Sequence, residues 1–297
     1  MSHAPLLSPR LQALLARSRL RPRTARPLGG QGDRSSSARG SGLEFAEHRP
    51  YQPGDDLRHV DPHLEARLGE TYIREYSLDQ QLPVTLVLDV SASMAAGEPS
   101  RLDYARELAA AVAFLALSAS DRVRLAAVQD GRVLFSEWFN GARNAERVYA
   151  WLADLEPAEG SDLDGAAPEL ASKLPAAGQV FIFSDWFDQK SERLPLLLGG
   201  EGREVLAVHL FTPADADPAQ LSVSGDVRFM DAETGEELEV ALTEQALTEY
   251  RAAWNGFVGD LRDSLQSRQA LYLPVQLDQT VEDVLLRDWT GRGLILR

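Results

Sequence analysis

Three short polar segments carry the residue types of a divalent-metal site. Asp89-Val90-Ser91-Ala92-Ser93 directly follows an apolar run at 84–88, Gly160-Ser161-Asp162 precedes a helical pattern, and Ser184-Asp185 follows a second apolar run. Together these segments offer carboxylates and hydroxyls, without a thiol or an imidazole. Mg²⁺ and Mn²⁺ prefer such oxygen ligands, in octahedral geometry at about 2.1 Å for Mg²⁺. We therefore predict one divalent-metal site, with Asp89, Ser91, Ser93, Ser161 and Asp185 as its ligands.

The elements around these segments predict how they come together. Apolar runs typical of buried strands alternate with stretches of helical spacing, which predicts an α/β fold with a mostly parallel, doubly wound sheet and helices on both faces. In such sheets, ligands bind at the carboxyl ends of the strands, so the three segments are expected to converge there. Strands are predicted at 84–88, 123–129, 133–139, 180–183, 204–211 and 270–275, and helices at 101–118, 144–155, 163–174, 191–198, 243–269 and 281–289.

The ligand types favour binding over catalysis. An ion held by two aspartates and neutral hydroxyls stays electron-poor, and a vacant position on it would attract an Asp or Glu carboxylate from a partner protein. The alternative is a metal-dependent hydrolase acting on a phosphoester, which needs a general base or a second ion to activate water. The segments contain no histidine, and Asp162, Asp164 and Asp188 are the spare carboxylates. A scaffold whose site stays empty is a third reading.

The three segments resemble the metal-ion-dependent adhesion site of von Willebrand factor A domains. Asp89, Ser91 and Ser93 match the Asp-x-Ser-x-Ser motif of that family, and Asp185 matches its aspartate after a later strand. Ser161 stands where the family more often has threonine, which keeps the hydroxyl. Asp162 could replace it or reach the ion through water, so the second-segment ligand stays open. The resemblance implies a Rossmann-like fold that binds a protein partner through the ion.

A second pattern lies ahead of the metal motif. Arg49-Pro50-Tyr51-Gln52-Pro53-Gly54-Asp55-Asp56-Leu57-Arg58-His59-Val60-Asp61 resembles the bacterial family called domain of unknown function 58, and the similarity runs from about residue 30 to the C-terminus. Pro62 replaces the family's usual tryptophan. The resemblance implies a MoxR-type AAA+ ATPase, or the client of such an ATPase, as the partner, in an adaptor or co-chaperone role. The role of the Tyr51–Asp61 motif itself is open.

Two features of that motif have structural alternatives. Asp55 and Asp56 could form a second acidic site, but capping a helix and pairing with Arg49 or Arg58 is the favoured reading. His59 and His63 are four residues apart, yet Pro62 lies between them and no third ligand is near, so zinc is not expected. Trp186 and Phe187, directly after Asp185, could line the partner surface or cover the sheet edge, and the sequence does not decide between these.

Charge and spacing divide the chain into three predicted parts. Residues 1–40 contain eight arginines and one acidic residue, with a helical pattern at 6–20 and a loop or linker from 22 to 37, so this arm is basic. Residues 41–82 hold the family-specific segment, including a strand at 71–78. Residues 83–297 form the von Willebrand factor A-like domain, with a small β-hairpin insertion at about 213–242 whose turn is Asp231–Glu236.

The bulk composition excludes several classes of protein. The net charge of −15, which is −22 without the basic arm, argues against nucleic acid as the main partner. Cysteine is absent, so disulfides and thiolate metal sites are excluded. No apolar run approaches the roughly 20 residues of a membrane helix, and the opening residues lack the features of a secretory signal. We therefore expect a cytoplasmic protein without a transmembrane segment.

Overall fold

The protein is described by a computed structural model that covers most of the chain. The described residues are 6–23, 43–78, 81–97, 99–129, 131–158, 162–187, 194, 198–200, 202–221, 226–232 and 235–297. Ser161, Asp188 and most of the predicted loop at 22–37 and helix at 191–198 lie outside these ranges. The chain forms two compact units, one of residues 27–81 and one of residues 1–26 and 82–297.

Six of the described strands form the sheet of the larger unit, in the order β11-β8-β7-β4-β5-β6. All neighbours are parallel except β5 and β6, which are antiparallel. From β6 to β11 the strands follow the chain order 3-2-1-4-5-6, the doubly wound arrangement, so the predicted fold class is confirmed. The strands are β4 (Pro83–Asp89), β5 (Arg122–Gln129), β6 (Arg132–Asn140), β7 (Ala177–Ser184), β8 (Gly202–Phe211) and β11 (Leu271–Gln276).

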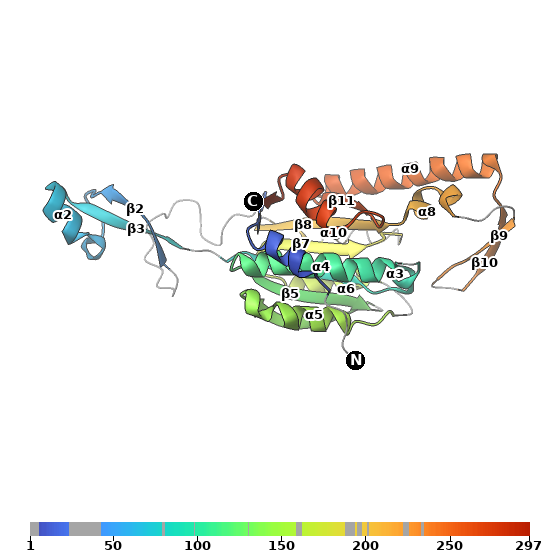
Figure 1. The fold of residues 1–297 in the computed structure, drawn as a ribbon, viewed down its shortest axis with the longest axis horizontal. Coiled ribbons are helices and arrows are strands. Elements are labelled where there is room, and N and C mark those ends of the chain that lie inside the picture. The colour runs from blue at the N-terminus through green and yellow to red at the C-terminus, as the bar shows by residue number, and fades with distance from the viewer. Residues whose placement is uncertain are drawn as a thin grey trace. The chain divides into compact units, whose positions relative to one another are not determined.

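The two central strands, β4 and β7, are buried along their whole length. Alternate residues of each strand enter different cores, as the two-residue period of a strand requires. Leu86 and Phe181 pack with α4 (Arg101–Ser118) and α5 (Ala145–Ala153) on one face. Val87 and Ile182 pack on the other face with α6 (Leu163–Lys173) and α9 (Glu244–Ser267). The sheet is thus covered on both sides (Figure 1).

The N-terminal segment belongs to the larger unit and differs from the single helix predicted at 6–20. Helix α1 spans only Pro9–Leu15, and Ser8 caps it by accepting the N–H of Leu11 at 3.2 Å. The chain then forms β1 (Arg19–Leu20), which pairs antiparallel with β12 (Ile295–Leu296). Leu11 and Leu15 are buried in the core, so the helical spacing was real. Strand pairing with the C-terminus, which local spacing does not reveal, ends the helix early.

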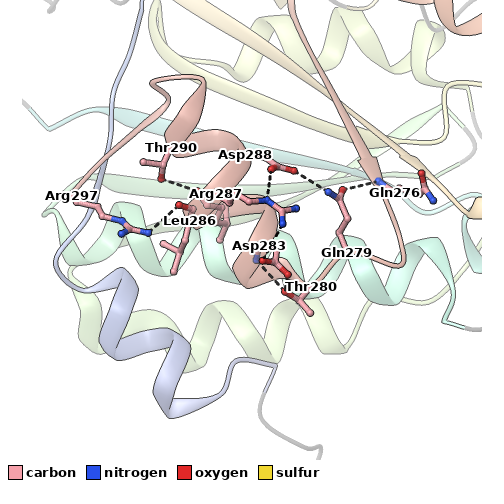
Figure 2. Close-up of polar contacts among 10 residues, drawn as sticks. Gln276, Gln279, Thr280, Asp283, Leu286, Arg287, Asp288, Thr290 and Arg297 are labelled. Carbon is pink, nitrogen blue, oxygen red and sulfur yellow. Dashed lines mark hydrogen bonds and ion pairs between the residues drawn. The ribbon is translucent and has the colours of Figure 1, made fainter.

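The C-terminal helix closes the carboxyl end of β11. It begins as α10 (Val281–Asp283) and continues as a π-helix, η5 (Val284–Trp289), within the predicted helix at 281–289. Figure 2 shows Gln279 directed toward Asp288, and its Nε2 donates to the Asp288 Oδ2 at 3.0 Å. The hydroxyl of Tyr104, on α4, donates to the Gln279 carbonyl at 2.9 Å. These hydrogen bonds hold the turn that follows β11 against the first part of α4.

The segment after β8 forms the predicted insertion. It contains α8 (Pro213–Ala216), η4 (Pro218–Gln220) and a hairpin of β9 (Asp226–Met230) and β10 (Glu237–Ala241), which pair antiparallel. Thr212 and Asp215 cap α8 reciprocally. Helix α9 begins after the hairpin, at the end of the sheet where the short helix α3 (Ala92–Ala95) also lies (Figure 1).

The smaller unit contains β2 (Leu43–Pro50), η1 (Leu57–His59), α2 (Pro62–Leu68) and β3 (Tyr72–Leu78), with β2 and β3 antiparallel. The two terminal nitrogens of Arg49 each donate a hydrogen bond to the Asp55 carboxylate, both at 2.7 Å. This pairing lowers the pKa of Asp55 to about 2. Asp56 caps η1 by accepting the Arg58 N–H at 3.0 Å. The structural reading of both aspartates is therefore confirmed.

Pro62 occupies the first position of α2, where its missing N–H costs no helical hydrogen bond. Asp61 precedes it as the helix cap, accepting the His63 N–H at 2.9 Å and lying 2.9 Å from the His48 Nε2. The Tyr51–Asp61 motif thus joins β2 to α2. Within the part of the chain that the structure describes, no helix is both long enough and apolar enough to cross a bilayer.

Candidate metal centre

The site lies at the carboxyl ends of β4 and β7, the adjacent strands at which the winding of the sheet reverses. Asp89 ends β4 and is 3 % exposed. Its Oδ1 accepts the Ser91 N–H at 3.0 Å, and its Oδ2 accepts the Ser184 hydroxyl at 2.8 Å. Ser184 ends β7, so one hydrogen bond joins the ends of both strands. This reversal point is where ligands bind in open α/β sheets.

The loop after β4 holds two serine hydroxyls together. Ser91 is buried and immediately precedes the short helix α3 (Ala92–Ala95), which contains Ser93. The Ser91 and Ser93 Oγ atoms are 3.0 Å apart. The main chain of the loop turns because the Asp89 carboxylate accepts the Ser91 N–H, an arrangement typical of aspartate followed by a turn. The predicted ligands of the first segment are therefore neighbours.

Asp185 supplies the second carboxylate and is 3 % exposed. Its Oδ1 accepts the Phe187 N–H at 3.2 Å, while its Oδ2 is buried without a hydrogen-bond partner among the described residues. Burial and the nearby charge of Asp89 raise the pKa of Asp185 to about 6, against the opposing effects of Arg101, the Phe187 N–H and the Ser93 hydroxyl. A buried carboxylate oxygen left unpaired is costly, and a bound cation would satisfy it.

A buried arginine, Arg101, lies beside these carboxylates and was missed by the sequence analysis. It is 7 % exposed, its Nη1 donates to the Ser93 carbonyl at 3.1 Å and its Nη2 to the Asp215 Oδ2 at 2.5 Å. It thereby ties the first loop to α8. Arg101 is the first residue of α4, where the helix dipole disfavours positive charge. That mismatch is the signal that could have identified it.

The second predicted segment is only partly described. Ser161 lies outside the described residues, so its place as a ligand stays a prediction. Asp162 is exposed and caps α6, because its Oδ1 accepts the Gly165 N–H at 2.7 Å. Asp164, in the first turn of α6, has an Oδ1 that is buried and has no hydrogen-bond partner in the described ranges. The cap gives Asp162 a structural role of its own.

A histidine on the neighbouring strand is a poor general base. His209, on β8, is fully buried among aromatic rings, and its Nδ1 lies 2.7 Å from the Tyr272 hydroxyl. Burial lowers the pKa of His209 to about 3, so it is neutral near pH 7. A base with so low a pKa accepts a proton weakly. The hydrolase alternative therefore gains no support from this side chain.

The structure brings Asp89, Ser91, Ser93 and Asp185 to one place, and the Ser184 hydroxyl positions the Asp89 carboxylate. Two carboxylates and two hydroxyls form a donor set suited to Mg²⁺ or Mn²⁺. The Asp185 Oδ2, which has no hydrogen-bond partner among the described residues, fits such an ion.

The chain is similar to several proteins of known sequence or structure. It is 27 % identical over 263 residues to an uncharacterized protein of Mycobacterium tuberculosis (Rv1480) and to one of Mycobacterium bovis (Mb1516), covering 87 % of this chain and 80 % of each relative. Among solved structures, it is similar to the conserved hypothetical protein BatB from Bacteroides thetaiotaomicron (TM-score 0.44, 13 % identity, 72 % of this chain and 98 % of that chain). It is also similar to the SpRpn10 VWA domain (TM-score 0.39, 11 % identity, 69 % and 94 %).

The family match covers more of the chain than the motif at 49–61 that first indicated it. The model of the family described as "Protein of unknown function DUF58" matches residues 47–255, which include the Tyr51–Asp61 motif, both carboxylates of the candidate centre and the hairpin insertion. This chain belongs to the DUF58 family.

Proposed function

We propose that this protein is a protein-interaction module, not an enzyme, that binds a partner carboxylate through a divalent ion. Asp89, Ser91, Ser93, Ser161 and Asp185 would hold Mg²⁺ or Mn²⁺, and an Asp or Glu of the partner would take the open position on the ion. The observation that carries the proposal is the buried, unpaired Oδ2 of Asp185 beside the charge of Asp89.

Electrostatics explains why an ion suits this place. Two buried carboxylates at close range repel each other, and the described hydrogen bonds to Asp185 satisfy only one of its oxygens. A divalent cation would replace that repulsion by two attractions in surroundings where water screens little. Neutral serine hydroxyls add ligands without adding negative charge. The ion would therefore keep part of its positive charge for a third carboxylate from outside.

The partner follows from the family resemblance and not from the geometry. The resemblance implies relatives that work with MoxR-type AAA+ ATPases, so we propose such an ATPase, or its client, as the protein that offers the carboxylate. An adaptor or co-chaperone role in the cytoplasm would fit this pairing. Comparing affinity captures on the immobilised protein in Mg²⁺ and in EDTA would identify the partner. Capture of the same proteins under both conditions would contradict a metal-mediated contact.

Metal binding is tested first with Mn²⁺ alone. We expect equilibrium dialysis of the EDTA-treated protein to show one Mn²⁺ per chain, displaced by Mg²⁺, and none in the variants Asp89→Ala and Asp185→Ala. Asp263→Ala is the matched control, because Asp263 is an exposed carboxylate near the far end of α9, where the helix leads back to the start of β11. A parent protein that binds no Mn²⁺, or an Asp185→Ala variant that binds it as well as the parent, would overturn the proposal.

A further inference from the structure

Two neighbouring aromatic residues after β7 differ sharply in exposure. Trp186 is 1 % exposed, whereas Phe187 is 44 % exposed. Trp186 has a φ of +59°, in the left-handed region that bulky residues rarely adopt. Such backbone strain persists only where the surroundings impose it, and it is concentrated at functional sites. The sequence left open whether this pair covers the sheet or lines a surface; in the structure, Trp186 does the first and Phe187 remains outside.

The candidate metal centre itself imposes this turn. The Ser184 hydroxyl oxygen accepts the Trp186 N–H at 3.0 Å, and the Asp185 Oδ1 accepts the Phe187 N–H at 3.2 Å. The Trp186 indole N–H donates to the Val208 carbonyl at 3.1 Å, which anchors the ring inside. The residues that shape the centre therefore also place the Phe187 ring outside.

Despite its exposure, the Phe187 ring is held in place. It lies 5.7 Å from the ring of Phe257 and 6.3 Å, edge-on, from that of Trp254, both on α9. The Arg101 guanidinium lies 5.7 Å from its ring centroid. A ring that is already ordered loses little further entropy when a partner packs on it. Ordered aromatic side chains beside a charged group are frequent centres of binding energy in protein interfaces.

We propose that Phe187 is the apolar half of the partner-binding surface and that the partner segment carries an Asp or Glu one or two residues from a large apolar side chain. This inference rests on the proposed function. Phe187 follows Asp185 by two residues, a separation of at most about 7 Å along the chain. A carboxylate on the ion and an apolar side chain on the ring thus require a similar short spacing in the partner.

The charge of the protein favours this composition over a run of acidic residues. The chain carries a net charge of −15, so its surface is acidic as a whole. A strongly acidic segment would be repelled by such a surface. A single carboxylate, neutralised by the ion and followed by an apolar side chain, avoids that repulsion while gaining contact area on Phe187.

The test is a selection of random seven-residue peptides displayed on phage, on the immobilised full chain, in Mg²⁺ and in EDTA. We expect the Mg²⁺-dependent peptides to share an Asp or Glu within two residues of Leu, Ile, Met, Phe or Trp. Synthetic copies of a selected peptide are then titrated by fluorescence polarisation. We expect replacing its apolar residue by Ala, or changing Phe187→Ala in the protein, to weaken binding about ten-fold, or about 1.4 kcal/mol. Combining both changes should add little, since both remove one contact.

Leu134→Ala is the matched control, because Leu134 is an exposed apolar residue on the edge strand β6, and we expect it to leave the affinity unchanged. Mn²⁺ binding is measured on every variant. Enriched acidic peptides without an apolar neighbour, equal affinity of the Phe187→Ala variant, or loss of Mn²⁺ from that variant would each overturn the inference. So would a parent that binds Mn²⁺ but selects no peptide, whereas a parent that binds no Mn²⁺ overturns the proposed function itself.

Discussion

Replacing Asp185 by asparagine should stabilise the metal-free protein while making it insensitive to Mg²⁺. Asparagine keeps the shape of the side chain and removes its charge. Burial and the charge of Asp89 raise the pKa of Asp185 from 3.8 to about 6 in the folded protein, so the folded state binds the proton more tightly than the unfolded state does. The contribution of Asp185 to the free energy of unfolding is therefore full below pH 3.8 and is lost as the pH rises through about 6.

The size of the effect follows from that rise in pKa. At 1.36 kcal/mol per pH unit, it corresponds to about 3 kcal/mol of folding free energy that the ionised Asp185 withholds at pH 7. For a domain of roughly this size, 1 kcal/mol shifts the midpoint of thermal unfolding by about 2–4 °C. In EDTA at pH 7, the Asp185→Asn variant should therefore unfold roughly 6–12 °C above the parent. At pH 4 the difference should almost vanish, because the parent is then largely protonated at this residue.

Thermal unfolding followed by circular dichroism, in EDTA and in Mg²⁺, checks both parts of the expectation. Mg²⁺ should raise the midpoint of the parent and leave that of Asp185→Asn unchanged. The exposed-site variant Asp263→Asn should behave like the parent throughout. If Asp185→Asn unfolds at or below the parent temperature in EDTA at pH 7, the ionised Asp185 carboxylate does not destabilise the metal-free protein, which would refute this expectation. A retained response to Mg²⁺ would equally remove Asp185 from the ligand set.

Two further substitutions test the charges around the centre. Arg101→Met should lower the free energy of urea unfolding by roughly 1.5–3 kcal/mol, because it removes a charged hydrogen bond from the partly buried carboxylate of Asp215. It should also tighten Mn²⁺ binding, because a positive charge beside Asp185 is gone; unchanged Mn²⁺ affinity would contradict this. His209→Phe should make the protein lose less stability when the pH is lowered. Since burial lowers the pKa of His209 to about 3, its contribution is full above pH 6.5 and is lost as the pH falls toward 3. Measured by urea unfolding in Mg²⁺, the fall in stability from pH 7 to pH 5 should be about 2 kcal/mol smaller in the variant than in the parent; an equal fall in both would refute this.

The mostly parallel sheet could be predicted, though not the order of its strands, because parallel strands covered on both faces need nearly continuous apolar sequences. The runs at 84–88 and 180–183 have this character and become the two central strands. Polar residues that directly follow such runs must lie at one edge of the sheet. Four of the five predicted ligands therefore come together in the structure, although the strands that carry them are far apart in the chain. Their binding of a metal ion remains a prediction.

Contacts between distant segments explain what the sequence did not reveal. Arg101 pairs with Asp215, 114 residues away, and no local pattern identifies that partner. Trp186 is buried while Phe187 is exposed because Trp186 adopts a left-handed backbone angle and its indole N–H bonds to the Val208 carbonyl of the next strand. Strand β2 was missed because Leu43–Pro50 contains several charged residues and pairs with β3, in a separate unit. In each case, tertiary contacts override local preference.

In the candidate centre, two carboxylates that repel each other are held by buried strands and by hydrogen bonds, and a bound ion would account for both features. Two buried carboxylates beside each other should push the loops apart, yet the Ser184 hydroxyl bonds to Asp89 while accepting the Trp186 N–H, and both strands beneath are wholly buried. The repulsion is therefore held within a frame of buried strands and hydrogen-bonded loop residues. An ion entering this frame would meet ligands already oriented, so little of its binding energy would be used for rearrangement. The same frame fixes the exposed ring of Phe187, which is why the metal centre and the apolar contact are expected to recognise a partner as one surface.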